Sequence, residues 1–476
     1  MQDVYQSPLV SRYATREMLK LFSPLKRTLT WRKLWVALAK AEMMLGLPIT
    51  KEQVDELISN IENIDEAAIA QKEQEVRHDV MAHIYGYGLV CPKAKSIIHL
   101  GATSCYLTDN ADILIYDEAL DCLKQKLLTL ISRLADFAGK YRLLPTLGYT
   151  HFQSAQPVTV GKRACLWIQD FIMDLEELSF TKDNLLLLGS KGTTGTQASF
   201  LSLFNGDHSK VLRLDEMIAE EFKMKGCYPI TGQTYPRKVD SRILNTLSSI
   251  AQSSYRFATD IRLLQHLHEV EEPFEVSQVG SSAMAYKRNP MRSERVCSLA
   301  RYVIVNSQNG PLTASSQWLE RTLDDSANRR ISLPESFLAT DAILNLLINI
   351  STNLKVYPAI IKKHLNAQMP FIATENLLME AVKRGGDRQT IHEIIRLHSM
   401  AALEQIKEEG ADNDFIERLA CDKRLPLTHE EIIKLLEPIN YVGRAPEQVD
   451  EYLTNTVQPL IKSCGDFTDV KDELTI

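Results

Sequence analysis

The sequence lacks the features that mark a secreted, membrane-spanning or disulfide-linked protein. Its eight cysteines are scattered, with no Cys-x-x-Cys pair and no paired spacing, which argues against a disulfide framework. The N-terminal region holds no apolar run flanked by basic residues, so we expect no secretory signal. The most apolar window, residues 342–350, is broken by two asparagines and is too short to span a bilayer. We therefore expect a cytoplasmic protein with reduced thiols.

An excess of positive charge is absent as well. The chain has 54 Lys and Arg against 61 Asp and Glu, a net charge of −7, which argues against nucleic acid or an anionic membrane as a partner. There is no His-Glu-x-x-His, no clustered Cys/His spacing, no Walker glycine loop and no Gly-x-Gly-x-x-Gly opening a helix. We expect neither a metal ion nor a cofactor. Internal repeats and low-complexity tracts are also missing.

The length and composition describe an ordinary globular protein with more than one domain. At 476 residues the chain exceeds what a single core usually supports, so two or three domains are expected. Apolar residues make up 45% and charged residues 24% of the chain, the balance of a folded protein. Three proline-free stretches, residues 93–144, 158–228 and 237–272, leave room for long helices.

Apolar residues in the central region recur at helical spacing. One seam consists of Leu120, Leu123, Leu127, Leu130, Leu134 and Phe137. A second runs from Ile243 to Leu264, and a third helix is expected over residues 335–356. We predict an all-α protein with three mostly helical domains: residues 1–103, a long-helix bundle at 104–356, and residues 357–476. Because such seams often continue across subunits, we expect a homo-oligomer.

The two ends of the chain carry shorter helical patterns. Thr50 with Gln53, and Thr428 with Glu431, have the spacing of capping boxes, which predicts a helix start at each place. We find no convincing alternation of apolar and polar residues, so no strand is expected.

The most informative segment is Gly280–Met291, Gly-Ser-Ser-Ala-Met-Ala-Tyr-Lys-Arg-Asn-Pro-Met. It combines two serines, a lysine and an asparagine with little apolar character, a pattern suited to a mobile loop that closes over an anion. A polar surface loop without chemistry is the alternative if the segment is considered alone. A base such as Ser281 would need Lys287 nearby, because a serine alkoxide must be stabilised by positive charge.

Two further segments hold candidate acids. His151 lies between Thr150 and Gln153, ahead of a helix that we expect after Pro157. Histidine exchanges a proton near neutral pH, although an isolated histidine in a polar turn is more often exposed or capping. His78, between Arg77 and Asp79, could be an oriented acid or part of a surface salt bridge.

Two more segments are suited to anions. Gly101, Thr103 and Ser104 resemble a turn into a helix that we expect to begin near Asp109. Hydroxyls and free N–H groups at a helix start bind carboxylates, although an ordinary N-cap has the same residues. In the segment Arg321–Arg330, the two terminal arginines flank Ser326 and could hold a phosphate dianion. The alternative there is a charged helix surface with internal Arg–Asp pairs.

Together these segments resemble the fumarase/aspartase superfamily, whose members eliminate fumarate from succinyl-type substrates. Gly280–Met291 is similar to the loop that the superfamily shares, although Ala285 stands where proline is usual, which predicts a looser loop. The resemblance covers nearly the whole chain and is closest to the branch that acts on succinyl-substituted purine nucleotides. The stretches that indicate this branch are Ser11–Tyr13, Arg77–Asp79, Lys191–Ser199 and Arg321–Arg330.

The resemblance implies a role for each matching residue. Ser281 would be the base, with Lys287 beside it, and His151 the acid. His78 would lie in the site, and which histidine protonates the nitrogen stays open. The nucleotide phosphate would be held by Arg12, Tyr13, Arg321, Ser326 and Arg330, and the base or ribose by Asp79, Gln233 and Arg295. The succinyl carboxylates would be held by Thr103, Ser104, Thr150, Lys287 and Asn289. Arg77 is placed with the substrate-binding residues.

The same resemblance implies the reaction and the assembly. Adenylosuccinate would yield AMP and fumarate, and succinyl-aminoimidazole carboxamide ribotide would lose fumarate in the same way. Each active site would be assembled from three subunits of a homotetramer with a shared helical core. Two alternatives stay open: another fumarate-releasing lyase, such as one acting on argininosuccinate, or an inactive structural paralogue.

Overall fold

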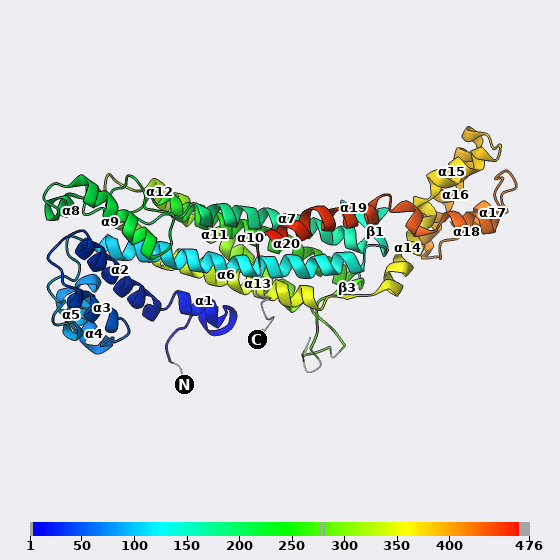
Figure 1. Cartoon of the computed structure of the whole chain (residues 1–476). Helices are drawn as coiled ribbons and strands as arrows, with labels where there is room; N and C mark the ends of the chain where they lie inside the picture. The colour runs from blue at the N-terminus through cyan, green and yellow to red at the C-terminus, as the bar shows by residue number, and fades with distance from the viewer. Residues whose placement is uncertain (1–2, 276–277, 279–281, 285, 466–476) are drawn as a thin grey trace.

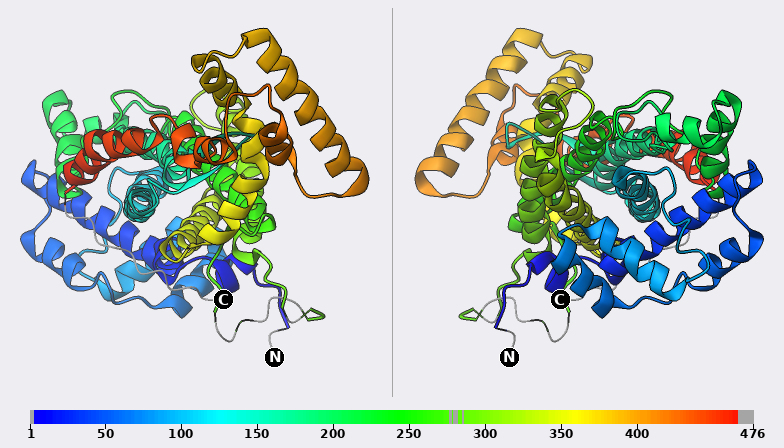
Figure 2. Two further views of the ribbon diagram at one scale, coloured as in Figure 1. Left: turned by 90° about the vertical axis from the view of Figure 1, so that its right-hand side faces the viewer. Right: turned by 90° about the vertical axis from the view of Figure 1, so that its left-hand side faces the viewer.

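The computed structural model describes residues 3–465 apart from 276–277, 279–281 and 285. These residues form a long bundle of helices with a smaller helical body at each end (Figure 1). Views along the bundle place the N-terminal helices and the C-terminal body on opposite sides of its axis (Figure 2). The expected all-α, multi-domain fold is confirmed.

Four long helices and one shorter one build the bundle: α6 (Ser104–Lys140), α7 (Val160–Asp183), α10 (Lys238–His266), α11 (Met291–Asn306) and α13 (Asp324–Thr352). Helix α6 packs against α7 and α13, while α10 packs against α7, α11 and α13. Helix α6 has 37 residues, so it extends about 55 Å at 1.5 Å per residue. This length separates the two ends of the molecule.

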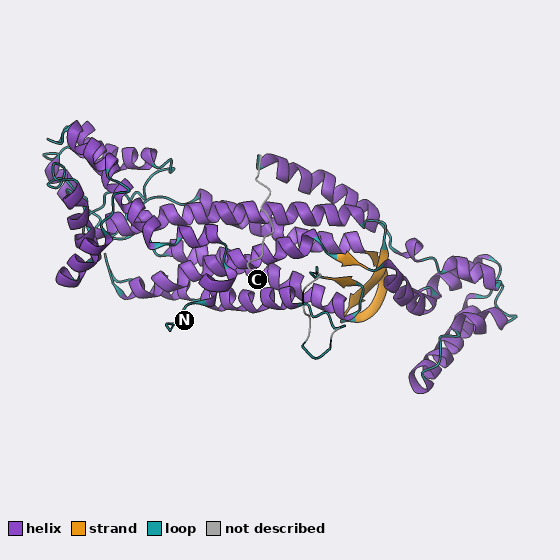
Figure 3. Ribbon diagram, turned by 90° about the horizontal axis from the view of Figure 1, so that it is seen from below, coloured by secondary structure: helices purple, strands orange, loops and turns teal. Residues whose placement is uncertain are grey.

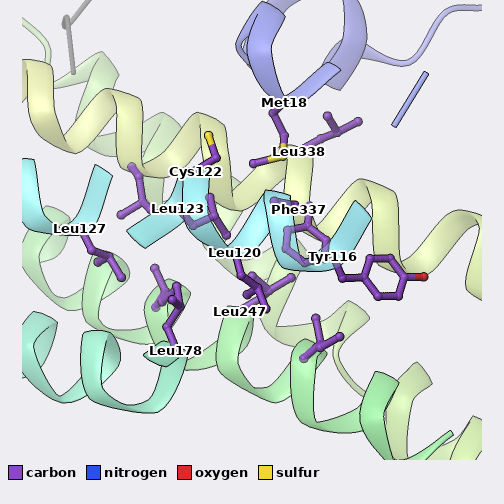
Figure 4. Packing of buried hydrophobic residues seen from close by; sticks show 14 of the residues in the cluster. Met18, Tyr116, Leu120, Cys122, Leu123, Leu127, Leu178, Leu247, Phe337 and Leu338 are labelled. Carbon is purple, nitrogen blue, oxygen red and sulfur yellow. The ribbon is translucent and has the colours of Figure 1, made fainter. Parts of the chain in front are cut away.

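The apolar seam predicted in the first helix faces the bundle core. Leu120, Leu123 and Leu127 are completely buried, and Figure 4 shows them beside Leu178 of α7 and Leu247 of α10. The helix starts at Ser104, five residues before the position expected from the sequence. It starts earlier because Cys105, Tyr106 and Leu107 are already buried, a short apolar run that the seam pattern did not include.

The third expected helix also begins earlier than predicted. Helix α13 starts at Asp324 rather than at Glu335, with Pro334 inside it. A proline inside a helix removes one backbone hydrogen bond, but here packing against α6, α10 and α11 outweighs that loss. By length and composition α13 could cross a membrane, yet 83% of its most apolar window is buried inside the protein. It is therefore a core helix of the bundle.

Shorter helices form the two end bodies, as the sequence predicts. Those before the bundle are η1 (Leu9–Tyr13), α1 (Arg16–Leu21), α2 (Pro24–Met44), α3 (Lys51–Ser59), α4 (Glu66–Val76) and α5 (Asp79–Val90). Short helices also join the long ones: α8 (Ala198–Leu203), α9 (His208–Glu221) and α12 (Asn309–Ser315). Both predicted capping boxes are confirmed, at the start of α3 and of α18.

The C-terminal region folds outward and then returns to the bundle. Its helices are α14 (Pro358–Ile372), α15 (Thr374–Lys383), α16 (Arg388–Glu409), α17 (Phe415–Cys421), α18 (His429–Leu435), η2 (Pro438–Tyr441), α19 (Ala445–Tyr452), η3 (Leu453–Val457) and α20 (Gln458–Ser463). A separate apolar cluster fills this body between Leu377 and Ile432. Helix α19 packs on α7, and Val449 and Val457 join the main core. The exact domain boundaries stay a prediction.

The expectation of no strands is wrong. β1 (Pro145–Thr150) and β2 (Gln153–Thr159) form an antiparallel hairpin, and β3 (Val270–Glu271) pairs with β4 (Lys355–Val356). Figure 3 shows these strands at the end of the bundle next to the C-terminal body. The hairpin has no regular alternation of buried and exposed residues, which explains why the sequence pattern missed it.

Glu42 on α2 is fully buried, and neither of its carboxylate oxygens has a hydrogen-bond partner among the described residues. Burial raises the pKa of Glu42 from 4.5 to about 8. The unfolded chain therefore releases this proton near pH 4.5, while the folded chain keeps it until about pH 8. The folded state binds more protons in this window, so the free energy of unfolding falls as the pH rises through it.

We expect Glu42→Gln to remove this part of the pH dependence. For wild type, the contribution of Glu42 falls by about 1.4 kcal/mol per pH unit between roughly pH 5 and 8, and it levels off above that range. Urea unfolding of wild type and variant at several pH values measures the difference. Parallel stability curves for the two proteins would show that Glu42 does not hold its proton in the folded state.

Candidate active site

A cavity of about 640 Å³ lies at the N-terminal end of the bundle. Its wall is built from the α1–α2 junction, the α4–α5 junction, the first turns of α6, the loop before α10 and the start of α13. Eight residues predicted from the sequence line it: Arg77, His78, Asp79, Ser104, Gln233, Arg321, Ser326 and Arg330. Segments far apart in the sequence thus converge on one polar cavity.

The junction between α4 and α5 presents His78 to the cavity. Arg77 ends α4 in the left-handed conformation, with φ of 52°, and His78 caps α5 by accepting the Met81 N–H at its Nδ1, 3.5 Å away. A neutral ring that accepts at Nδ1 carries its proton on Nε2. That Nε2 lies 3.5 Å from the Ser104 hydroxyl. His78 is therefore oriented to donate toward the first turn of α6, where Thr103 occupies the N-cap position.

Buried ion pairs support the opposite wall. The Arg237 guanidinium donates to Asp109 Oδ2 at 2.9 Å and to Asp325 Oδ2 at 2.6 Å. Arg321 donates to the other oxygen of Asp325 at 2.8 Å. Burial alone would raise the pKa of Asp325, but the two arginines hold it below its usual range. Arg321 is thus fixed in place by a carboxylate that stays ionised.

A second buried pair lies next to the first. Arg329 donates through Nε to Asp240 Oδ2 at 2.6 Å and through a terminal nitrogen to Asp112 Oδ2 at 2.9 Å. Tyr235 donates to the same Asp240 at 2.6 Å. Sequence reasoning missed Arg237 and Arg329, because an arginine that pairs with distant aspartates has no local pattern.

The start of α13 has the character of an anion site. Ser326 is the third residue of this long helix, and Arg321 and Arg330 lie on either side of it. Free N–H groups and the helix dipole favour negative charge at such a place. Arg330 has only a 3.4 Å contact with Asp79 and is mostly exposed, so it can turn to a ligand. Arg321, in contrast, pairs with Asp325 at 2.8 Å as the alternative of a self-paired surface predicts, so phosphate binding here stays a prediction.

Two more cavity arginines have no carboxylate partner among the described residues. Arg77 was expected from the sequence, whereas Arg27 on α2 was not. The Nε of Arg27 is buried without a hydrogen bond, and its guanidinium lies 5.3 Å from the centre of the Trp31 ring. An anionic ligand would satisfy these groups.

The wall that carries Gln233 depends on a close backbone contact. The Gln233 N–H donates to the Glu320 carbonyl at 2.9 Å, which joins this loop to the segment before α13. Behind it, Gly195 has a φ of +82°, and a Cβ there would lie 1.9 Å from the Thr231 carbonyl oxygen. The glycine-rich stretch Lys191–Ser199 therefore serves as the support of this wall.

His151 lies far from the cavity, at the tip of the β1–β2 hairpin. The helix expected after Pro157 is confirmed, since α7 begins at Val160, but the strand β2 lies between His151 and this helix. His151 and Phe152 form the two-residue loop, with φ of 52° and 57°. Positive φ at both positions is typical of type I′ turns, which favour Asn and Gly. Thr150 and His151 are both exposed there.

Five further predicted residues lie outside the cavity wall, in η1 and around the start of α11. The Arg295 guanidinium lies 5.5 Å from the centre of the Tyr13 ring, and Arg12 belongs to the same turn, η1. This turn is held in place at Thr15, whose N–H donates to the buried Asp341 at 2.8 Å. Lys287 and Asn289 lie just before α11, with Lys287 exposed. Ser281 and Ala285 lie outside the described residues.

One chain therefore does not bring all the candidate residues together. The cavity includes Ser104 at the start of α6, whereas the hairpin with His151 follows the end of that helix (Figure 1). Helix α6, about 55 Å long, lies between the two sites. A single copy presents an arginine-lined cavity at one end and a histidine hairpin at the other.

Comparison with known proteins gives close relatives over the whole chain. The family model described as Lyase matches residues 17–305, and the one described as Adenylosuccinate lyase C-terminus matches residues 370–452. Adenylosuccinate lyase of Saccharomyces cerevisiae is 51% identical, covering 98% of this chain and 98% of that protein. Those of Schizosaccharomyces pombe and Schistosoma mansoni are 50% and 47% identical, each covering 99% or more of both chains.

Solved structures share the fold at lower identity. The 3-carboxy-cis,cis-muconate lactonizing enzyme from Pseudomonas putida aligns with a TM-score of 0.82 at 23% identity, covering 95% of this chain and 99% of that one. A fumarate lyase from Mesorhizobium sp. aligns with a TM-score of 0.79 at 23% identity, covering 95% and 100%. These similarities establish the fold alone.

The contact at Gly195 yields a matched pair of substitutions. Gly192 has a similar φ of +78°, but nothing lies within 4 Å of the position of its missing Cβ. We expect Gly192→Ala to cost only the strain of a left-handed alanine, about 1 kcal/mol. Gly195→Ala should cost at least about 2 kcal/mol more, because the backbone at Thr231 must move. Urea unfolding measures both, and equal losses would contradict the close contact.

Proposed function

The chain belongs to the adenylosuccinate lyase family, and from that premise we propose that it eliminates fumarate from adenylosuccinate, giving AMP, and from succinyl-aminoimidazole carboxamide ribotide. The resemblance found in the sequence is confirmed, and the chain is a carbon–nitrogen lyase of purine nucleotide biosynthesis. The observation that carries this conclusion is identity of about half over nearly the full length of named relatives. The roles of individual residues below are part of the proposal.

The cavity is suited to the nucleotide half of the substrate. The phosphate would lie at the start of α13, where Arg321, Ser326 and Arg330 offer guanidinium forks, a hydroxyl and the helix dipole. Gln233 and Asp79 on neighbouring walls would contact the base or ribose. Arg12, Tyr13 and Arg295 would reach the nucleotide from another copy, because they lie outside the cavity wall.

The reaction needs a base, an acid and fixed positive charge. Ser281 would remove a proton from the carbon next to one carboxylate, leaving a doubly charged aci-carboxylate. Lys287 and Asn289, with Thr103, Ser104 and Thr150, would hold the two carboxylates and this extra charge. The electron pair then forms the double bond of fumarate as the C–N bond breaks, and His151 would protonate the leaving nitrogen. His78 is the alternative acid.

We propose a homotetramer in which three subunits contribute to each site. The support is the length of α6, about 55 Å, which places His78 and the hairpin with His151 at opposite ends of this helix in one chain. A second copy running in the opposite direction would bring its hairpin to the cavity of the first, and a third would supply the loop before α11. We also propose a cytoplasmic location, in agreement with eight free cysteines.

A substrate panel followed by the absorbance of fumarate tests the function. We expect release from adenylosuccinate and from the succinylated ribotide, and none from argininosuccinate. Activity on argininosuccinate alone would support a different lyase. Binding of AMP without turnover of any substrate would indicate an inactive paralogue.

We expect Ser281→Ala to lower kcat by at least about 100-fold, the usual cost of losing a general base. AMP affinity should stay close to wild type, because the cavity is untouched. Steady-state kinetics and AMP titration measure the two quantities. A variant that keeps more than about a tenth of wild-type turnover would reject Ser281 as the base.

The variant His151→Asn tests whether the imidazole of His151 is needed for turnover when the hairpin turn keeps its conformation. Asparagine tolerates the left-handed conformation, so the hairpin should stay folded while turnover falls at least about 100-fold. His78→Gln should also be nearly inactive.

The two histidine variants together test the shared site. If each site combines His78 of one subunit with His151 of another, then mixing the two inactive variants, with unfolding and reassembly, restores part of the activity. Reassembled tetramers that remain inactive would contradict a site shared between subunits.

A further inference from the structure

Glu272 directly follows β3 and is only 3% exposed. Its carboxylate accepts the N–H groups of Arg292 at 2.9 Å and Ser293 at 2.8 Å, and also the Ser293 hydroxyl at 2.8 Å. Arg292 and Ser293 are the second and third residues of α11. One side chain thus joins the end of β3 to the start of α11.

This contact has the chemistry of a helix N-cap supplied from a distant position. The first N–H groups of a helix have no partner within it, and a carboxylate near them is stabilised by the helix dipole. The Arg292 guanidinium forms its own hydrogen bonds elsewhere, to Asn349 at 2.7 Å and to Glu275 at 2.9 Å. A buried carboxylate is costly unless donors surround it. The start of α11 supplies those donors.

A second side chain ties the same two points together. Gln265 on α10 is 7% exposed. Its Oε1 accepts the Glu272 N–H at 3.2 Å, and its Nε2 donates to the Arg288 carbonyl at 3.0 Å. The backbones of Glu272 and Arg288 are therefore both hydrogen-bonded to the side-chain amide of Gln265, which belongs to the bundle helix α10. Arg288 lies between Lys287 and Asn289, so this bond fixes the backbone at the two candidate substrate contacts.

We infer that Glu272 and Gln265 are positioning residues for the elimination, a role that rests on the proposed function. They touch no reacting atom. They fix the backbone of Lys287 and Asn289 against α11, and one turn further along that helix lies Arg295, beside Tyr13. Three candidate substrate contacts are thereby held relative to one another. A small displacement of such groups lowers turnover strongly, because a misplacement of about 1 Å can cost on the order of 100-fold.

Glu272→Gln tests this role, with Glu275→Gln as its matched control. Both remove one carboxylate from the same stretch, but Glu275 is exposed and contacts Arg292 only at its guanidinium. We call Glu272 and Gln265 together the clamp. We expect Glu272→Gln to lower kcat at least about tenfold while KM changes less, because neither clamp residue lines the cavity that would hold the nucleotide. Glu275→Gln should stay within about twofold of wild type. Equal kcat values for the two folded variants would overturn the proposal.

Hydrogen exchange gives a readout that does not depend on the reaction. We expect the amides of Arg292 and Ser293 to exchange faster in Glu272→Gln than in wild type, and to be unchanged in Glu275→Gln. If wild type releases no fumarate from any substrate of the panel, the proposed function fails, whereas the exchange data still test the clamp itself. If exchange at these two amides is the same in all three proteins, the clamp is wrong even in an active enzyme.

Gln265→Met keeps the proposal testable if Glu272→Gln does not fold. Methionine fills a similar volume on α10 but offers neither the acceptor for Glu272 nor the donor for Arg288. We expect a fall in kcat in the same direction with a smaller change in KM. Wild-type kcat in this variant would contradict a positioning role for the amide.

Discussion

The rigid length of α6 is the constraint on which the candidate active site depends. This helix begins at the cavity and ends just before the hairpin that carries His151, and it packs chiefly against α7 and α13, with buried residues from its first turn to its last. It cannot bend to bring the two ends together. A single chain therefore separates the arginine-lined cavity from the candidate acid, and association of several copies in opposite directions becomes part of the proposed mechanism.

Charge inside the bundle is concentrated where the cavity wall must be rigid. Arg237 and Arg329 are buried, and each bridges two aspartates from different segments. Such buried ion pairs are weak evidence for net stability, because taking charges out of water is costly. They do hold each arginine in one position, between its two aspartates. The exposed Arg330 contrasts with them, since it stays able to turn to a ligand. The cavity wall thus combines buried arginines held by ion pairs, Arg237 and Arg329, with the exposed Arg330, whose side chain is free to change conformation.

At the far end of the bundle, a tight turn and a few side-chain contacts to the backbone hold the candidate chemical groups in place. The His151 hairpin uses a two-residue turn with positive φ at both positions, a conformation that is unfavourable for non-glycine residues and typical of functional sites. The segment before α11 is held by Glu272 and Gln265 through backbone bonds. In both places exposed polar groups, His151 and Lys287, lie next to packed elements of the bundle.

The sequence by itself determined the superfamily, the helical class and the identity of most candidate residues, because helical spacing and short polar motifs are local properties. It predicted the helix over Ile243–Leu264 and both capping boxes, where the residues that form the element also specify it. It could not place the start of α13, since packing outweighs the proline that marks a boundary in sequence, and it missed the hairpin, whose turn lacks the usual Asn-Gly. Only the tertiary structure decided that Arg237 and Arg329 support the cavity and that Glu272 caps a helix it does not belong to. Those contacts join residues that no spacing relates, because they are brought together by the folding of the long helices.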